Sequence, residues 1–94
     1  MFIVFLRFSN NKAAAKTLMQ AHNAWLQQGI ASGLFLLAGS IQPNQGGCLL
    51  AGGDEGDLQA YIKQDPFVVN DVVTAELVEI SPAVANEKLQ FLLA

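Results

Sequence analysis

Apolar residues along the chain gather in short runs that predict four strands and two helices. Stretches rich in β-branched, aromatic and leucine residues favour strands, and they cover Phe2 to Phe8, Leu34 to Ile41, Gly47 to Ala51 and Val72 to Ile80. Residues 12 to about 28 favour a helix through their alanines, leucines and glutamines. Residues 54 to about 64 predict a second helix, which begins at the capping side chain of Asp54.

Glycine and proline indicate where these elements end. Gly29 or Gly33 is expected to end the first helix, because glycine favours the position after a helix C-terminus. Asp65-Pro66 is expected to end the second helix, and a loop through Asn70 should follow, since the residue before proline avoids helical geometry. Ser81-Pro82 predicts the start of a short C-terminal helix that ends near Leu93.

The order of these elements predicts a single α+β domain. The chain has 94 residues, and we expect a core over residues 1–80 and a tail or short helix over residues 81–94. The order β-α-β-β-α-β is that of the ferredoxin-like fold, with a four-stranded antiparallel sheet whose helices cover one face.

Both faces of the predicted sheet are apolar. Alternation places Phe2, Val4, Leu6 and Phe8 on one face of the first strand, and it groups Phe35 with Leu37, Gly39 and Ile41 in the second. Apolar residues make up 52% of the chain and charged residues only 14%, which is too few charges to cover the surface easily. We expect a homodimer in which the helix-free faces pack together, and the alternative is an unusually apolar monomer.

Charge and cysteine content exclude several function classes. The net charge is −3 and the basic residues are scattered, which argues against binding to nucleic acid.

No apolar run reaches the about 18 residues of a membrane span, and residues 1–8 lack the pattern of a signal peptide. A single cysteine, Cys48, forms no intrachain disulfide and fits the cytoplasm. One histidine and one cysteine do not supply the about three or four ligands of a zinc site, so we expect no metal.

His22, the only histidine, falls inside the apolar stripe of the first helix. At about 100° per residue it lies about 40° from Leu18 and close to Trp25, while Asn23 lies towards the far side. One interpretation is a core histidine whose hydrogen bonds are satisfied. The other is a titratable group in a pocket between the helix and the sheet, since histidine transfers protons near neutral pH.

Asp65 is the second candidate for chemistry. We expect it at the C-terminal end of the second helix, where the helix dipole disfavours a carboxylate. A local capping or turn role before Pro66 is one interpretation. The other is a carboxylate that orients His22 by binding one ring nitrogen, which would fix the tautomer and raise the basicity of the other nitrogen. Spacing along the sequence does not show whether the two side chains meet.

Several short motifs occur in a recognisable order. They are Ala21-His22-Asn23-Ala24-Trp25-Leu26, Leu37-Ala38-Gly39-Ser40, the Gly46-Gly47 turn and Asp65-Pro66-Phe67-Val68. In these motifs, over roughly residues 1–80, the chain resembles the YCII-related (YciI-like) family of small bacterial proteins. The resemblance implies a ferredoxin-like chain that dimerises through its sheet as a dimeric α+β barrel.

The resemblance also implies an active site built on a histidine and an aspartate, which are His22 and Asp65 here. It implies elimination or isomerisation of small cyclic or aromatic acids without an organic cofactor. Where the family has Gly-Pro or Gly-Gly after the second strand, this chain has Gly39-Ser40, which adds a hydroxyl group.

Three further residues are candidates for substrate binding. Arg7 would hold an anionic group through a bidentate contact, or it is a surface residue of a strand. Ser40 would hydrogen-bond a ligand or simply end a strand, and Phe67 belongs to the Asp65-Pro66 motif. The chain is thus interpreted as a small-molecule enzyme, or alternatively as a ligand-binding or interaction module in which the histidine and aspartate are structural.

Overall fold

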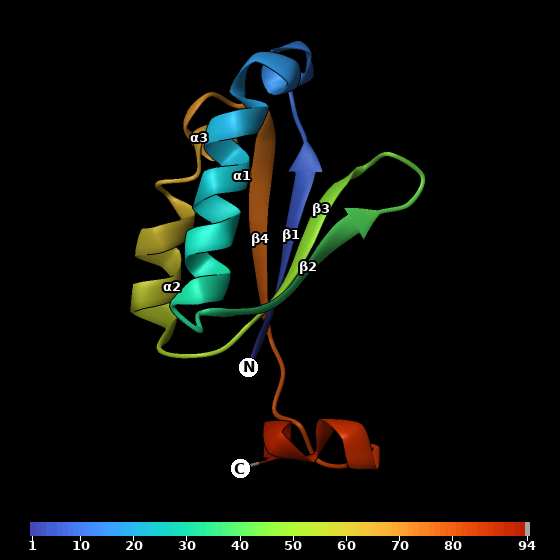
Figure 1. Ribbon diagram of the computed structural model, residues 1–94. Coiled ribbons are helices and arrows are strands. Elements are labelled where there is room, and N and C mark those ends of the chain that lie inside the picture. The colour runs from blue at the N-terminus through green and yellow to red at the C-terminus, as the bar shows by residue number, and fades with distance from the viewer. Residues whose placement is uncertain (94) are drawn as a thin grey trace.

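The chain folds into one four-stranded antiparallel sheet with helices on one of its faces (Figure 1). The computed structural model describes residues 1–93. The elements along the chain are β1 (Phe2–Phe8), the 3-10 turn η1 (Lys12–Ala14), α1 (Ala15–Ala31), β2 (Phe35–Ile41), β3 (Gly46–Ala51), α2 (Glu55–Ile62), α3 (Pro66–Val69), β4 (Val73–Glu79) and the 3-10 segment η2 (Glu87–Leu93). The strand order is β2-β3-β1-β4, and the predicted ferredoxin-like α+β fold is confirmed.

The core lies between the sheet and the helices, and alternation along β1 builds it. Phe2, Val4 and Leu6 are buried on the helix-covered face. Leu49 and Ala51 of β3 pair with Val4 and Phe2, so they join the same apolar layer. The helices complete the core with Trp25, Leu58 and Ile62.

The two glycines that were candidates for ending α1 have different roles. The helix continues through Gly29, where a Cβ atom would collide with the buried ring of Phe35. Gly29 therefore lets the helix approach the sheet closely. Gly33 follows the helix with a φ of +83°, a conformation that glycine adopts without steric cost.

A short helix replaces the loop predicted between Asp65 and Asn70. Residues Pro66–Val69 form α3, and proline at the first helical position is compatible with its fixed φ and missing N–H. The prediction of a loop was wrong here because the signal that ends α2 also begins a new helix.

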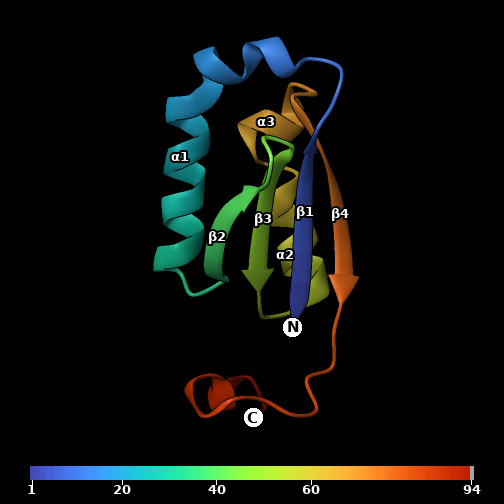
Figure 2. The same cartoon turned by 90° about the vertical axis from the view of Figure 1, so that its right-hand side faces the viewer.

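The C-terminal segment leaves the body of the molecule beyond β4 (Figure 2). Residues 81–86 have no regular secondary structure, and the 3-10 segment begins at Glu87 rather than at Ser81-Pro82. Val84 and Phe91 are largely exposed. The last residue of the predicted tail, Ala94, lies outside the described residues. No helix within residues 1–93 is long and apolar enough to cross a membrane.

The helix-free face of the sheet carries an apolar row across all four strands. Ile3 pairs with Leu50 and Val78, and Leu37 pairs with Leu50 from the other side. A register shift in β2 separates Phe35 from Leu37, so strict alternation was wrong in placing both on one face. As a result Phe35 is buried in the core, whereas Leu37 is 62% exposed.

Candidate active site

His22 lies on the side of α1 that faces the sheet, as the helical spacing predicts. The residue is 9% exposed, and Trp25 and Gly29 continue the same buried stripe. A polar ring at this depth is costly unless it finds a hydrogen-bond partner.

Asp65 is completely buried between α2 and α3. It is the N-cap residue of α3, and its Oδ1 accepts a hydrogen bond from the backbone N–H of Phe67 at 3.0 Å. The expected position at the C-terminal end of the second helix was therefore wrong, because α2 ends at Ile62. The carboxylate stabilises the start of a helix instead of opposing the end of one.

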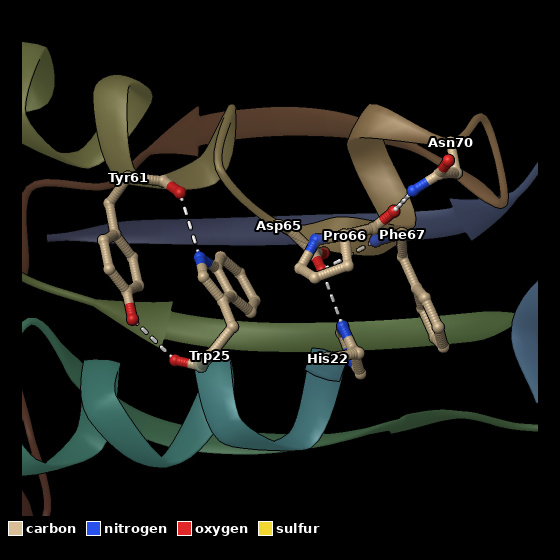
Figure 3. A network of polar contacts seen from close by, with 7 residues as sticks. All are labelled: His22, Trp25, Tyr61, Asp65, Pro66, Phe67 and Asn70. Carbon is tan, nitrogen blue, oxygen red and sulfur yellow. Dashed lines mark hydrogen bonds and ion pairs between the residues drawn. The ribbon is translucent and has the colours of Figure 1, made fainter. Parts of the chain in front are cut away.

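The fold brings His22 and Asp65 into contact across 43 residues of sequence. His22 Nδ1 lies 2.7 Å from Asp65 Oδ1 (Figure 3). The same Oδ1 accepts the N–H of Phe67, and an ionised carboxylate has no proton to donate, so Nδ1 is the donor. The proton of the neutral ring therefore resides on Nδ1, and Nε2 retains a free lone pair.

Aromatic packing fixes the orientation of the imidazole. The ring of Phe67 stacks on His22 with centroids 3.9 Å apart and an interplanar angle of 2°. Trp25 lies on α1 next to His22, with its ring centroid 5.7 Å away. Phe67 thus holds the pair in two ways, because its backbone binds the carboxylate and its side chain supports the imidazole.

A second pair of contacts joins α1 and α2 beside His22 and Asp65. Trp25 Nε1 donates to the backbone oxygen of Tyr61 at 3.0 Å, and the Tyr61 hydroxyl donates to the backbone oxygen of Trp25 at 2.7 Å (Figure 3). Their rings stack with centroids 5.2 Å apart. This reciprocal exchange holds the two segments that carry His22 and Asp65 in register.

The negative charge of Asp65 also affects the pKa of Tyr61. The second carboxylate oxygen of Asp65, Oδ2, is buried and finds no hydrogen-bond partner within residues 1–93. Burial, and then the negative charge of Asp65, raise the pKa of Tyr61 above its usual value of 10.0.

A cavity of about 390 Å³ is lined by His22 and not by Asp65. Because Nδ1 is turned towards the carboxylate, the ring edge that reaches the cavity is the one with Nε2. The volume is in the range of small-molecule sites. The apolar wall consists of Leu6, Phe8, Met19, Leu26, Phe67 and Val73.

Polar side chains complete the lining. Ser40, a candidate from the sequence, lies in the wall, as does Phe67. Asn23, which was expected towards the far side of the first helix, is exposed and also lines the cavity, because the cavity extends along the flank of α1. Gln42 and Asn44 also line the cavity, but they were not among the candidates chosen from the sequence. The one feature of the sequence that pointed to them was their position in the turn before Gly46-Gly47.

Arg7 is not brought to this cavity. It follows Leu6 in β1, and alternation turns it to the helix-free face. There its Nη1 donates to Glu76 Oε1 at 2.7 Å, and its guanidinium lies 4.5 Å from the centroid of the Phe5 ring. Arg7 is therefore remote from the site that His22, Asp65, Ser40 and Phe67 form.

Within residues 1–93, no three side chains of histidine, cysteine, aspartate or glutamate gather to form a metal site. Cys48 is a half-buried free thiol that pairs with Phe5 in the sheet.

The structure is similar to that of 5-chloro-2-hydroxyhydroquinone dehydrochlorinase (TftG) from Burkholderia phenoliruptrix AC1100, in complex with 2,5-dihydroxybenzoquinone. The TM-score is 0.69 at 14% sequence identity, over 85% of this chain and 93% of that chain. No family model matches the chain, and no curated protein matches it in sequence. The likeness shows that the two chains share a fold.

The tautomer of His22 should depend on Asp65. In the unsubstituted protein we expect neutral His22 to carry its proton on Nδ1, and in Asp65→Ala we expect a mixture of tautomers because the acceptor is gone. Nitrogen-15 chemical shifts of the single histidine, recorded where imidazole is neutral, measure this directly. Asp71→Ala, which removes an exposed carboxylate, should leave the shifts unchanged. A native ring protonated on Nε2 would contradict the geometry.

The raised pKa of Tyr61 should make the protein less stable in alkali. Folding holds the phenolic proton more tightly than the unfolded chain does, so this stability is complete below pH of about 10 and is lost as pH rises through the folded pKa. Urea unfolding at increasing pH should show this loss in the unsubstituted protein and not in Tyr61→Phe.

Absorbance of the single tyrosinate gives the pKa of Tyr61 itself. Asp65→Asn should lower this pKa only in part, because burial is the larger cause. An ordinary pKa in the folded protein would contradict the assignment.

Proposed function

We propose that this chain is a cofactor-independent enzyme that transfers a proton on a small cyclic or aromatic molecule, with a lyase or isomerase outcome. The observation that carries the proposal is the 2.7 Å contact between His22 Nδ1 and Asp65 Oδ1, with the opposite ring edge facing a cavity. A base needs both features, since it must hold the correct tautomer and reach its substrate.

In the proposed mechanism, Nε2 of His22 removes a proton from a carbon next to a carbonyl group. The electron pair of the broken C–H bond moves into an enolate, and the imidazolium that forms is stabilised by the Asp65 carboxylate. Return of the proton to another carbon gives an isomer. Elimination follows when the enolate electron pair forms a new carbon–carbon double bond and a leaving group on the neighbouring carbon departs with the electron pair of its own bond to carbon. Ser40 lines the same cavity, and in this proposal its hydroxyl donates to the enolate oxygen.

The structural neighbour supports this class of reaction on this fold. TftG is a dehydrochlorinase of 5-chloro-2-hydroxyhydroquinone, which is a hydroxylated six-membered ring. The proposal includes membership of the YciI-like family, which the resemblance of the motifs around His22 and Asp65 supports. It also includes a cytoplasmic location, which Cys48 as a free thiol fits.

The proposed assembly is a homodimer joined through the helix-free face. The apolar row of Ile3, Leu37, Leu50 and Val78 supports it, because an exposed apolar patch that spans a sheet typically marks an interface. In that dimer the pair of Arg7 and Glu76 would lie at the interface rather than at the cavity.

A non-catalytic ligand-binding module is the alternative. Asp65 Oδ1 also caps α3, which is a structural role that needs no chemistry. If His22 and Asp65 serve only this purpose, removing His22 should cost about 3–5 kcal/mol of unfolding free energy, because it leaves a buried charge unpaired.

Proton transfer is measurable without knowing the natural substrate. In D₂O the protein should speed deuterium incorporation next to the carbonyl of compounds in a panel of small cyclic ketones and lactones, followed by NMR. His22→Ala should lower the rate about 10²–10⁴-fold, because it removes the base. Asp65→Asn should lower it about 10–100-fold, because it removes the charge that stabilises the imidazolium.

Gln27→Ala, on the exposed side of α1, is the matched control and should leave the exchange rate unchanged. Urea unfolding of the same variants separates the two functions. Lost exchange in a variant that still folds supports catalysis, even where its unfolding free energy falls because Asp65 has lost a donor. Lost stability with unchanged exchange contradicts the proposed mechanism and favours the structural role.

The dimer has its own test. Leu37→Lys places a charge in the apolar row and should yield a monomer in sedimentation at micromolar concentration, because an unpaired buried charge is costly. Val69→Lys is the matched control: Val69 is 66% exposed, similar to Leu37, but it lies on α3. Val69→Lys should remain a dimer. An unsubstituted protein that is already monomeric would exclude the assembly.

A further inference from the structure

The cavity beside His22 has no positively charged lining. The chain contains five lysines and arginines, all within the described residues, and none of them lines the cavity. Arg7 is paired with Glu76 on the other face of the sheet. Lys12 Nζ lies 4.5 Å from the centroid of the Phe8 ring, which is part of the lining, but Lys12 itself does not line the cavity.

The charge behind the cavity is negative. With Asp65 ionised, the His22–Asp65 pair has a net charge of −1 when the imidazole is neutral and zero when it is protonated. In neither state does the pair offer a net positive charge to a ligand. A carboxylate in the cavity would face the buried Asp65 across one imidazole ring, with no cation in the lining to compensate its charge.

Neutral hydrogen-bonding groups surround the cavity instead. They come from α1, from β2 and from the turn that follows β2, and they are Asn23, Ser40, Gln42 and Asn44. None of their side chains makes a hydrogen bond within residues 1–93, whereas Asn11, Asn70 and Asn86 elsewhere do. Each of the four groups both donates and accepts, which suits hydroxyl and carbonyl groups.

The remaining wall is apolar and partly aromatic. Phe67 holds the imidazole from one side, and Leu6, Leu26 and Phe8 contribute apolar surface. An apolar wall with a polar rim fits a ring whose substituents point outward.

We infer that this cavity selects an uncharged ring compound carrying hydroxyl or carbonyl groups, and that Asn23, Ser40, Gln42 and Asn44 are the residues that select it. The inference rests on the proposed function. It narrows the proposed substrates from small cyclic or aromatic molecules in general to uncharged ones, whereas the family resemblance implies acids. Selection follows from charge: a neutral hydroxyl binds these groups at little cost, and a carboxylate loses its hydration without gaining a cation.

Two probes that differ only in charge test this inference. 4-Hydroxybenzyl alcohol and 4-hydroxybenzoate share a ring and a phenolic hydroxyl, and only the second carries a carboxylate. NMR titration of the His22 ring and the Ser40 amide gives both dissociation constants. The alcohol should bind at least about tenfold more tightly than the acid.

Variants of the turn after β2 show whether charge causes the preference. Gln42→Lys adds a cation to the lining and should improve binding of 4-hydroxybenzoate about tenfold. Gln45→Lys is the matched control, because it adds the same charge in the same turn at a residue that does not line the cavity. Gln45→Lys and Lys12→Gln should leave the preference unchanged.

Several outcomes would overturn the inference. It is wrong if the acid binds more tightly than the alcohol, if neither probe shifts the His22 signals at millimolar concentration, or if Gln45→Lys acts like Gln42→Lys. These failures are distinct from failure of the proposed function. If the protein does not prefer the alcohol but His22-dependent deuterium exchange is intact, only this inference is wrong. If the protein prefers the alcohol but does not catalyse deuterium exchange, the proposed enzymatic function is wrong.

Discussion

The buried carboxylate of Asp65 is the constraint on which the rest of the structure depends. An unpaired charge inside a protein is strongly destabilising, so the chain must bring donors to it. Two donors reach the same oxygen, the backbone N–H of Phe67 and Nδ1 of His22. The N–H of Phe67 belongs to the first turn of α3, which the carboxylate caps. The bond from His22 joins the start of α3 to the middle of α1. The imidazole thereby comes to lie between a fixed negative charge and an accessible cavity.

Rigid contacts surround this pair. The reciprocal hydrogen bonds of Trp25 and Tyr61 join α1 to α2, the helix that precedes Asp65, and Phe67 supports the imidazole by stacking. Sliding α1 along α2 would break both sets of contacts together. A base held in this way needs little reorganisation before it accepts a proton, which is the advantage of a preorganised site. Gln42 and Asn44 line the cavity from the exposed turn between β2 and β3, a segment that does not carry His22 or Asp65.

The sheet separates the proposed chemistry from the proposed assembly. Leu6 lines the cavity, and its neighbour Arg7 points to the opposite face beside Phe5 and Glu76. A strand can carry both sets of residues because successive side chains point to opposite faces. The high apolar content of this chain is then explained by a core on one face and the proposed interface on the other.

Local periodicity allowed the sequence by itself to determine the four strands, the main helices, the ferredoxin-like order and the burial of His22, because strand and helix periods depend only on neighbouring residues. The helix after Asp65, the register shift that exposes Leu37 and the place of Asn23 on the cavity depended on tertiary structure. So did the contact of His22 with Asp65, which the family resemblance implied but residue spacing did not show. Folding brings together these two groups, which lie 43 residues apart in the sequence. Burial then makes the hydrogen bond from His22 important for stability, because the Asp65 carboxylate is shielded from water.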